Sequence, residues 1–218
     1  RIVGCSSTFQ QHVASLALLR RIRELDPGIV TMMGGANCET EMGEATHRLF
    51  PWVDHVFSGE ADTLIEPLCS AIIRQETFTH PAIRSPVDRQ LRVGRPDAQP
   101  LGRGTVARLD TLPPPDFDDY FDALHASCLC PAIDVGLPVE TSRGCWWGAK
   151  HHCTFCGLNG GGMAFRSKSP ENAIDEMLDL SKRYGVTNLE VVDNILDMRY
   201  IGPVTDALAA AAPPLNIF

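Results

Sequence analysis

The chain has 218 residues, of which 44% are apolar and 21% charged, a composition typical of folded globular proteins. Its 27 acidic residues outnumber 19 Lys and Arg residues, so the formal net charge is −8. This charge excludes a protein whose main partner is nucleic-acid phosphate. No uninterrupted apolar run is long enough to span a bilayer. We expect one or two domains, a cytoplasmic location, reduced cysteines, and neither nucleic-acid nor membrane partners.

Residues 1–78 alternate short apolar runs with helical patterns, which predicts a parallel, doubly wound α/β sheet. In such sheets ligands bind at the loops that follow the strands. The first helix is expected to bury the face formed by Ala14, Leu18, Ile22 and Leu25. Strands are expected over residues 2–4, 29–33 and 53–57, and helices over 14–25, 39–49 and 63–74.

Residues 79–135 break this alternation, because prolines and arginines replace the regular apolar pattern. We predict a linker here, with a small hairpin and a short helix over residues 116–124. The arginines stand among Asp, Pro and Gly, so a solvated linker surface is favoured over a binding patch. They are Arg84, Arg89, Arg92, Arg95, Arg103 and Arg108.

From residue 136 onward the alternation returns and predicts the first part of a parallel barrel or of a doubly wound sheet. Ser169 and Pro170 are the residue types of a helix N-cap and first helical position, and Gly185 is expected to end that helix. A strand begins at Arg1 with no preceding element, and another strand is only beginning at Leu215. The chain is therefore expected to be a fragment of a longer protein. The other expected elements are strands over 139–142 and 188–192 and a helix over 203–211.

Three cysteines follow the first of these strands with the spacing C-x7-C-x2-C, at Cys145, Cys153 and Cys156. Three thiolates from one loop can hold three irons of a [4Fe–4S] cluster and leave the fourth iron open to a substrate. The alternative is a structural zinc site with His151 or His152 as fourth ligand. Structural zinc usually joins two separated ligand pairs, and the sequence has no second C-x2-C or H-x3-H pair. The cluster is therefore favoured.

The same loop resembles the cluster-binding loop of radical S-adenosylmethionine (SAM) enzymes, although their more common spacing is C-x3-C-x2-C. The longer spacing is similar to that of a subgroup active in ribosomal-peptide (RiPP) maturation, whose members carry an N-terminal cobalamin-binding domain. Shared motifs are Cys-Trp-Trp-Gly at 145–148, Cys-Thr-Phe-Cys-Gly-Leu-Asn-Gly at 153–160 and Phe-Arg-Ser-Lys-Ser-Pro at 165–170. The resemblance covers nearly the whole chain.

This resemblance implies a fold and a division of the chain. Residues 1–78 would be a partial Rossmann-like cobalamin-binding domain, 79–135 a linker, and 136–218 the first part of a radical SAM partial (β/α) barrel. The three cysteines would be the cluster ligands, and Phe155 would border the SAM adenine. Asp193 and Asn194 stand where the family has Gly-Gly-Glu, so they either contact SAM or form a plain strand-end turn. Arg166 either meets SAM or pairs with a carboxylate.

Three loops of the first domain would form a platform for cobalamin, as the resemblance implies. The usual D-x-H-x-x-G motif is absent, and its loop would precede residue 1, so the lower axial ligand stays open. The platform residues are Ser6, Ser7, Thr8, Gly34, Gly35, Ala36, Gly59 and Glu60.

The resemblance further implies an enzyme in which a reduced cluster donates an electron to SAM. The resulting 5′-deoxyadenosyl radical would abstract hydrogen from a precursor peptide, and methylcobalamin would supply a methyl group. Flavodoxin or ferredoxin would be the electron donor. Two alternatives stay open: radical SAM chemistry without methyl transfer, and a non-catalytic binding module stabilised by zinc.

Overall fold

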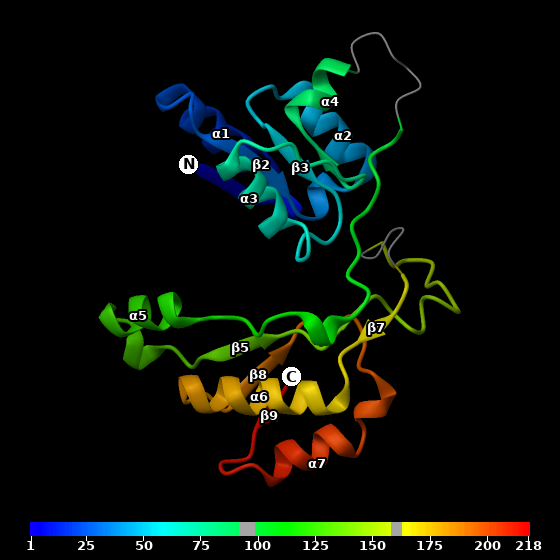
Figure 1. The fold of residues 1–218 in the computed structure, drawn as a ribbon. Helices are drawn as coiled ribbons and strands as arrows, with labels where there is room; N and C mark the ends of the chain where they lie inside the picture. Colours follow the sequence, from blue (N-terminus) through cyan, green and yellow to red (C-terminus); the bar gives the residue numbers. More distant parts are fainter. Residues whose placement is uncertain (92–98, 158–162) are drawn as a thin grey trace. The chain divides into compact units, whose positions relative to one another are not determined.

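The computed structural model describes residues 1–91, 99–157 and 163–218. The chain forms two compact units, Arg1–Val106 (unit 1) and Ala107–Phe218 (unit 2), which are considered separately (Figure 1). The boundary lies inside the segment 79–135 that the sequence predicts as a linker. Among the described residues no helix is both long and apolar enough to cross a membrane.

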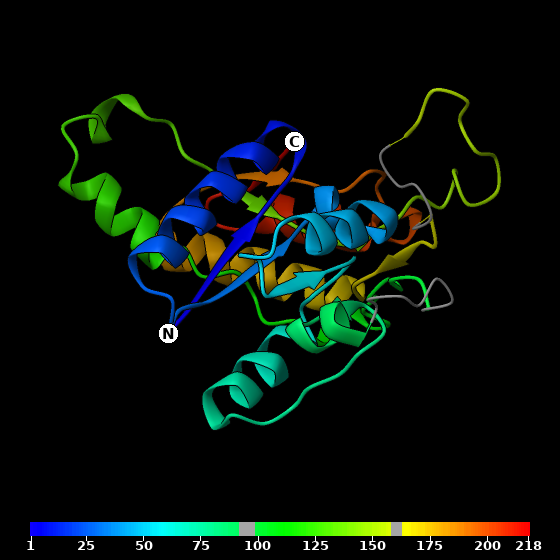
Figure 2. The same cartoon turned by 90° about the horizontal axis from the view of Figure 1, so that it is seen from above.

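Unit 1 is built on a sheet in which β1, β2 and β3 run parallel and β4 lies antiparallel beside β3 (Figure 2). The alternation of strands and helices is the predicted one, and the antiparallel β4 was not expected. The strands are β1 (Ile2–Ser6), β2 (Val30–Gly34), β3 (His55–Phe57) and β4 (Ile83–Arg84). The helices are α1 (His12–Leu25), α2 (Thr40–Leu49), α3 (Ile65–Arg74) and α4 (Pro86–Leu91).

Apolar side chains cover both faces of this sheet, because neighbouring residues of a strand point to opposite sides. Met33 of β2 packs in one core cluster with Leu16 and Leu19 of α1. Met32 packs in another cluster with Leu68 of α3. Helices on both faces of a mostly parallel sheet define a layered α/β fold.

The buried face of α1 overlaps the predicted one only at Ile22, which is partly buried against the same core cluster as Leu16 and Leu19. Leu16 and Leu19 are buried, whereas Leu18 and Leu25 are 53% and 68% exposed. Both stripes have helical spacing, so periodicity alone does not separate them. Contact with the sheet decides which stripe is covered.

The described residues 83–91 and 99–106 belong to unit 1 rather than to a solvated linker. The Arg84 side chain is buried, and its Nε donates to a Glu44 carboxylate oxygen at 2.9 Å. Arg89 donates to the Val53 carbonyl oxygen at 2.8 Å. The expectation of solvated arginines is therefore wrong at Arg84, where pairing makes burial of a cation tolerable. Outside the described residues lie Arg92 and Arg95.

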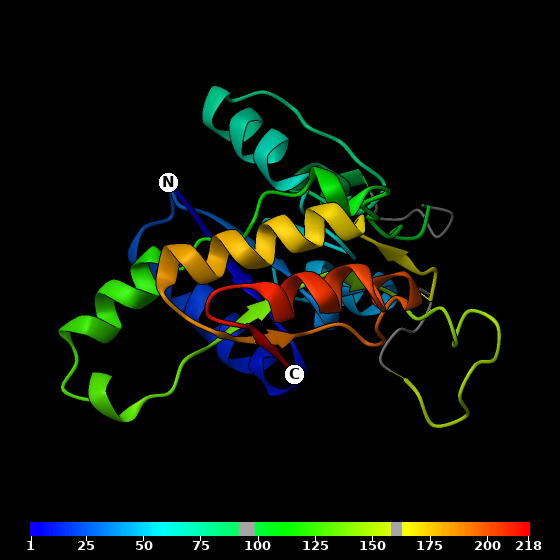
Figure 3. The ribbon, with the colours of Figure 1, turned by 90° about the horizontal axis from the view of Figure 1, so that it is seen from below.

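Unit 2 contains the parallel strands β5, β8 and β9, in that order across the sheet. Helices α6 and α7 lie side by side across one face of this sheet (Figure 3). The strands are β5 (Gly136–Val139), β6 (Ser142–Arg143), β7 (Arg166–Ser167), β8 (Asn188–Val191) and β9 (Asn216–Ile217). The helices are α5 (Asp118–Ala126), α6 (Pro170–Tyr184) and α7 (Pro203–Ala210).

Helix α5 belongs to the core of unit 2. Its side chains Phe121 and Leu124 are buried in the same cluster as Leu137 of β5. The Phe121 ring stacks on the Tyr184 ring, with centroids 4.7 Å apart. The short helix within residues 79–135 is confirmed, and its packing assigns it to unit 2.

Candidate functional site

The cysteine loop, residues 144–165, leaves the fold between two paired strands. β6 and β7 are antiparallel, with Arg143 opposite Arg166 and Ser142 opposite Ser167. This pairing joins the two ends of the loop. Its residues 158–162, including the glycine run at 160–162, lie outside the described residues.

Cys145 is held at the base of the loop. Gly144 has φ +83°, and a Cβ there would collide with the Ala164 carbonyl oxygen, so glycine is required at this position. The Cys145 backbone N–H donates to the Met163 carbonyl oxygen at 3.3 Å. Its Sγ accepts the Gly148 N–H at 3.2 Å. An N–H donated to sulfur is a contact that tunes iron–sulfur centres.

Cys153 and Cys156 form the distal part of the loop. The Cys156 N–H donates to the Cys153 carbonyl oxygen at 3.1 Å, which closes the C-x2-C turn. All eight cysteines of the chain are free thiols, and these two are partly exposed, as is Cys145. Three free thiols in one loop fit the donor set of an iron–sulfur cluster.

The three thiols are not gathered around one point. Within residues 1–91, 99–157 and 163–218, no three His, Cys, Asp or Glu side chains are arranged to hold a metal ion. This finding applies equally to the cluster and to the zinc site with His151 or His152. The ligand assignment therefore stays a prediction from the spacing.

The residues expected to contact SAM occupy different places. Phe155 is 91% exposed near the tip of the loop. Asp193, just after β8, accepts the Thr141 N–H at 2.9 Å and also the Thr141 hydroxyl. The Asn194 side chain approaches the Gly144 carbonyl oxygen at 3.5 Å. Asp193 thus acts as a strand-end anchor, and Asn194 lies beside the base of the cysteine loop.

Tyr200 ties the surrounding segments together. It is 1% exposed, and its hydroxyl oxygen lies within hydrogen-bond distance of the carbonyl oxygens of Lys168 (2.9 Å) and Thr141 (3.2 Å), which share its one proton. Burial raises the pKa of this phenol to about 12, so it stays a neutral donor. The ends of β5 and β7 are therefore held to the segment that follows β8.

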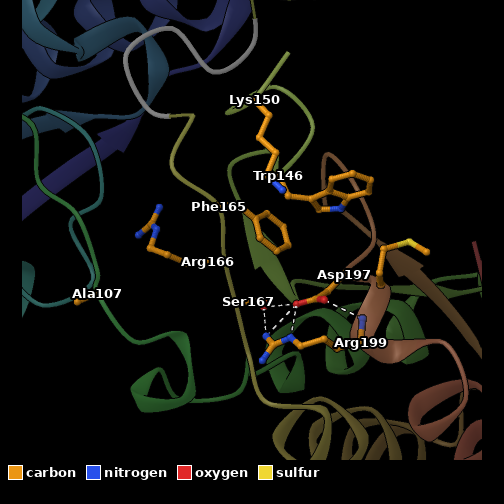
Figure 4. Close-up of a pocket in the computed structure, with 9 residues that line it drawn as sticks. Ala107, Trp146, Lys150, Phe165, Arg166, Ser167, Asp197 and Arg199 are labelled. Carbon is orange, nitrogen blue, oxygen red and sulfur yellow. Dashed lines mark hydrogen bonds and ion pairs between the residues drawn. The ribbon is translucent and has the colours of Figure 1, made fainter. Parts of the chain in front are cut away.

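A cavity of about 490 Å³, which we name the hairpin cavity, lies in unit 2 beside β7 (Figure 4). Arg166, a predicted SAM contact, lines it, whereas Phe155, Asp193 and Asn194 do not. Trp146 could have been found from sequence, since it follows Cys145 directly. The lining residues are Ala107, Trp146, Lys150, Phe165, Arg166, Ser167, Asp197, Met198 and Arg199.

An ion pair organises one wall of the hairpin cavity. The Asp197 carboxylate accepts the Arg199 Nε at 3.0 Å and Nη2 at 2.8 Å, and also the Ser167 hydroxyl. Burial raises the pKa of Asp197, but the hydrogen bonds from Arg199 and Ser167 outweigh it and hold the pKa below its usual value. Asp197 is therefore an anion at neutral pH. Sequence reasoning missed this pair, which has no motif of its own.

In unit 1, the predicted loops after β1 and β2 lie next to each other. The Ser7 N–H donates to the Gly34 carbonyl oxygen at 2.8 Å, and Ser7 is fully buried. Gly35 has φ +90°, and a Cβ there would lie 2.6 Å from the Ser7 carbonyl oxygen. The chain's own backbone thus fills the space beside Gly35. Ala36 is exposed at this edge.

The third predicted loop is covered by its own chain. A Cβ on Gly59 would lie 2.5 Å from the Gly104 carbonyl oxygen, which itself accepts the Glu60 N–H at 3.0 Å. The Glu60 carboxylate accepts the Val106 N–H at 2.6 Å. Residues 104–106 therefore occupy the space beside Gly59 that a ligand would need. Of the three predicted loops, those at Ser6–Thr8 and Gly34–Ala36 are the two that lie next to each other.

No model of a known protein family matches the chain. Its α/β fold, with parallel strands in both units, is similar to that of a cobalamin-dependent S-adenosylmethionine radical enzyme. The particular solved structure is that of OxsB, with a TM-score of 0.66 and 18% sequence identity. The match covers 99% of this chain and 29% of that chain. At this identity the likeness shows the fold.

Two curated relatives are methyltransferases by name. One, from Pyrococcus horikoshii, is an uncharacterized methyltransferase and is 25% identical. The other, from Streptomyces wedmorensis, is cytidylyl-2-hydroxyethylphosphonate methyltransferase and is 24% identical. Each match covers 88% of this chain and 39% of the relative, so the chain spans about two fifths of their length.

Proposed function

We propose that this chain is part of a cobalamin-dependent radical SAM enzyme that transfers a methyl group. The observation that carries the proposal is the loop with free thiols at Cys145, Cys153 and Cys156, in a fold similar to that of a cobalamin-dependent SAM radical enzyme. Both relatives are named methyltransferases, which supports methyl as the transferred group. When bound, the cluster would supply an electron for SAM cleavage, and cobalamin would supply the methyl group.

The residues of the cysteine loop would bind iron and orient SAM. Cys145, held by Gly144 and by the Gly148 N–H, would be the fixed ligand. Cys153 and Cys156 lie in the distal turn and would close onto the cluster as it binds. Phe155, exposed between them, would cover the adenine, since an exposed ring that stacks on a base loses contact with water.

Unit 1 would hold the corrinoid at the adjacent ends of β1 and β2. The side chains and backbone of Ser6–Thr8 and Gly34–Ala36 supply small, polar groups at this edge, where open parallel sheets bind ligands. We propose a ribosomal precursor peptide as substrate and flavodoxin or ferredoxin as electron donor. Radical SAM chemistry without methyl transfer is the alternative if no corrinoid binds.

Cluster binding is tested by metal analysis of anaerobically reconstituted protein. We expect about one four-iron cluster per chain, and its loss in Cys153→Ala and Cys156→Ala, because two irons then lack a protein ligand. Cys128→Ala is the matched control, since Cys128 is an exposed free thiol outside the loop. Stoichiometric zinc without acid-labile sulfide would contradict the proposal and favour the zinc-stabilised binding module.

Corrinoid binding is tested with the full-length protein by its visible absorbance. Gly35 is a poor probe, since any side chain there would collide with Ser7. Ala36→Trp is better, because Ala36 is exposed and a large ring would cover the strand ends. We expect weaker cobalamin binding in Ala36→Trp and unchanged binding in Ala17→Trp, on the exposed side of α1. If the unmodified protein binds no corrinoid, methyl transfer from cobalamin is refuted.

A further inference from the structure

The hairpin cavity is cationic, although the chain carries a net charge of −8. Lys150, Arg166 and Arg199 line it, against Asp197 as the carboxylate among its described lining residues. Cations around a cavity raise the local concentration of anions. The lining therefore favours a ligand with a negatively charged group.

Asp197 does not oppose an entering anion. Its side chain is 7% exposed, whereas that of Arg199 is 62% exposed. The ion pair thus keeps the carboxylate buried and holds the guanidinium at the open side. The Nη1 group of Arg199 has no hydrogen-bond partner among the described residues. A guanidinium held in place with a spare N–H group is suited to donate to an oxyanion.

The opposite side of the lining adds a second cation and two aromatic rings. Lys150 is exposed, and its ammonium has no ion pair in the described parts of the chain. The Trp146 Nε1–H donates to the Leu196 carbonyl oxygen at 3.0 Å, which fixes the indole beside half-buried Phe165. A volume of about 490 Å³ is that of a small-molecule site. The cavity therefore suits an oxyanion attached to an apolar or flat group.

We propose that the hairpin cavity binds an oxyanion of the enzyme's substrate, either a carboxylate or a phosphoryl group, with Arg199 as its ligand and Lys150 as a second cation that attracts it from the opposite side. This assignment rests on the proposed function, because it anchors the substrate beside the cysteine loop. Carboxylate and phosphoryl groups share the negative oxygens that a guanidinium recognises, so the chemistry of the site is the same for both.

The test is calorimetric titration of the chain at low ionic strength with inorganic phosphate, acetate and SAM separately. We expect Arg199→Gln to weaken anion binding about tenfold, since it removes a charge-assisted contact, and Lys150→Met to weaken it less, since it removes only nearby positive charge. Arg20→Gln is the matched control, because Arg20 is an exposed arginine on α1 with a side chain 63% exposed. Preference for acetate identifies a carboxylate such as an acidic peptide side chain, whereas preference for phosphate identifies a phosphoryl-bearing substrate and contradicts the ribosomal peptide proposed above.

Three results would overturn the assignment. The chain binds neither phosphate nor acetate, both variants bind these anions as tightly as the unmodified chain does, or the variants lose affinity for SAM alone. The last would assign the cations to the carboxylate of SAM. Lys150→Met should keep the melting temperature of the unmodified chain, because Lys150 is exposed and lies outside the core. Iron, sulfide and corrinoid are measured separately, so failure of the proposed function is distinguished from failure of the cavity assignment.

Discussion

Asp193 links the end of β5 to the segment after β8 through its carboxylate. Thr141 is buried, and both its N–H and its hydroxyl donate to Asp193. A buried donor that loses its acceptor costs the free energy of its desolvation. These contacts give Asp193 a structural role at the end of β5.

Replacing Asp193 tests this role. Asp193→Ala should lower the free energy of unfolding by about 1–3 kcal/mol, because it leaves the Thr141 donors unpaired. Asp193→Asn should cost less, since its amide oxygen still accepts one bond. Urea unfolding measures both, with Asp175→Ala on the exposed side of α6 as control. Unchanged stability together with weaker SAM binding would show instead that the carboxylate serves the ligand.

Helix α6 has the ends that its sequence predicts. The Ser169 side chain accepts the Asn172 N–H at 3.3 Å, and Pro170 occupies the first helical position. At the other end Gly185 adopts a left-handed conformation, with φ +67°. These local features fix where α6 begins and ends. Strand β7 lies directly before the start of α6, so the start of the helix also fixes the end of β7.

The C-terminal end of α6 offers a clean measurement of backbone strain. A Cβ on Gly185 would meet nothing within 4 Å, so substitution changes only the backbone preference. Gly185→Ala should lower the unfolding free energy by about 1 kcal/mol. Gly185→Asn should cost less, because Asn tolerates the left-handed region better. Equal melting temperatures for the two variants would mean that the helix end rearranges.

At the scale of the whole molecule, the division into units places the boundary at residues 106 and 107. We expect a fragment of residues 107–218 to unfold cooperatively, whereas a fragment of residues 136–218 should lack a fixed core. The second fragment loses Phe121 and Leu124, whose burial contributes about 1.5–3 kcal/mol each. Near-UV circular dichroism and urea unfolding distinguish the two. Cooperative unfolding of the shorter fragment would return the boundary to residue 135.

The sequence by itself determined most of the elements, because these depend on local patterns. Apolar periodicity predicted the parallel strands, although it placed β5 over residues 139–142, and the helices of both units except α4, and Ser169 and Gly185 marked the ends of α6. The spacing of Cys145, Cys153 and Cys156 carries the cluster hypothesis, whereas the described structure does not gather the three thiols around one point. Such features are encoded within a few residues, so a single sequence is enough to see them.

Tertiary structure alone decided which faces are buried and which distant residues meet. It selected the Leu16 stripe of α1, divided residues 79–135 between the two units, and closed the Gly59 loop with Gly104. It also brought Trp146 to one cavity with Arg199, far apart in the chain. These outcomes depend on burial against partners remote in sequence, and local propensity carries no information about which partner that will be.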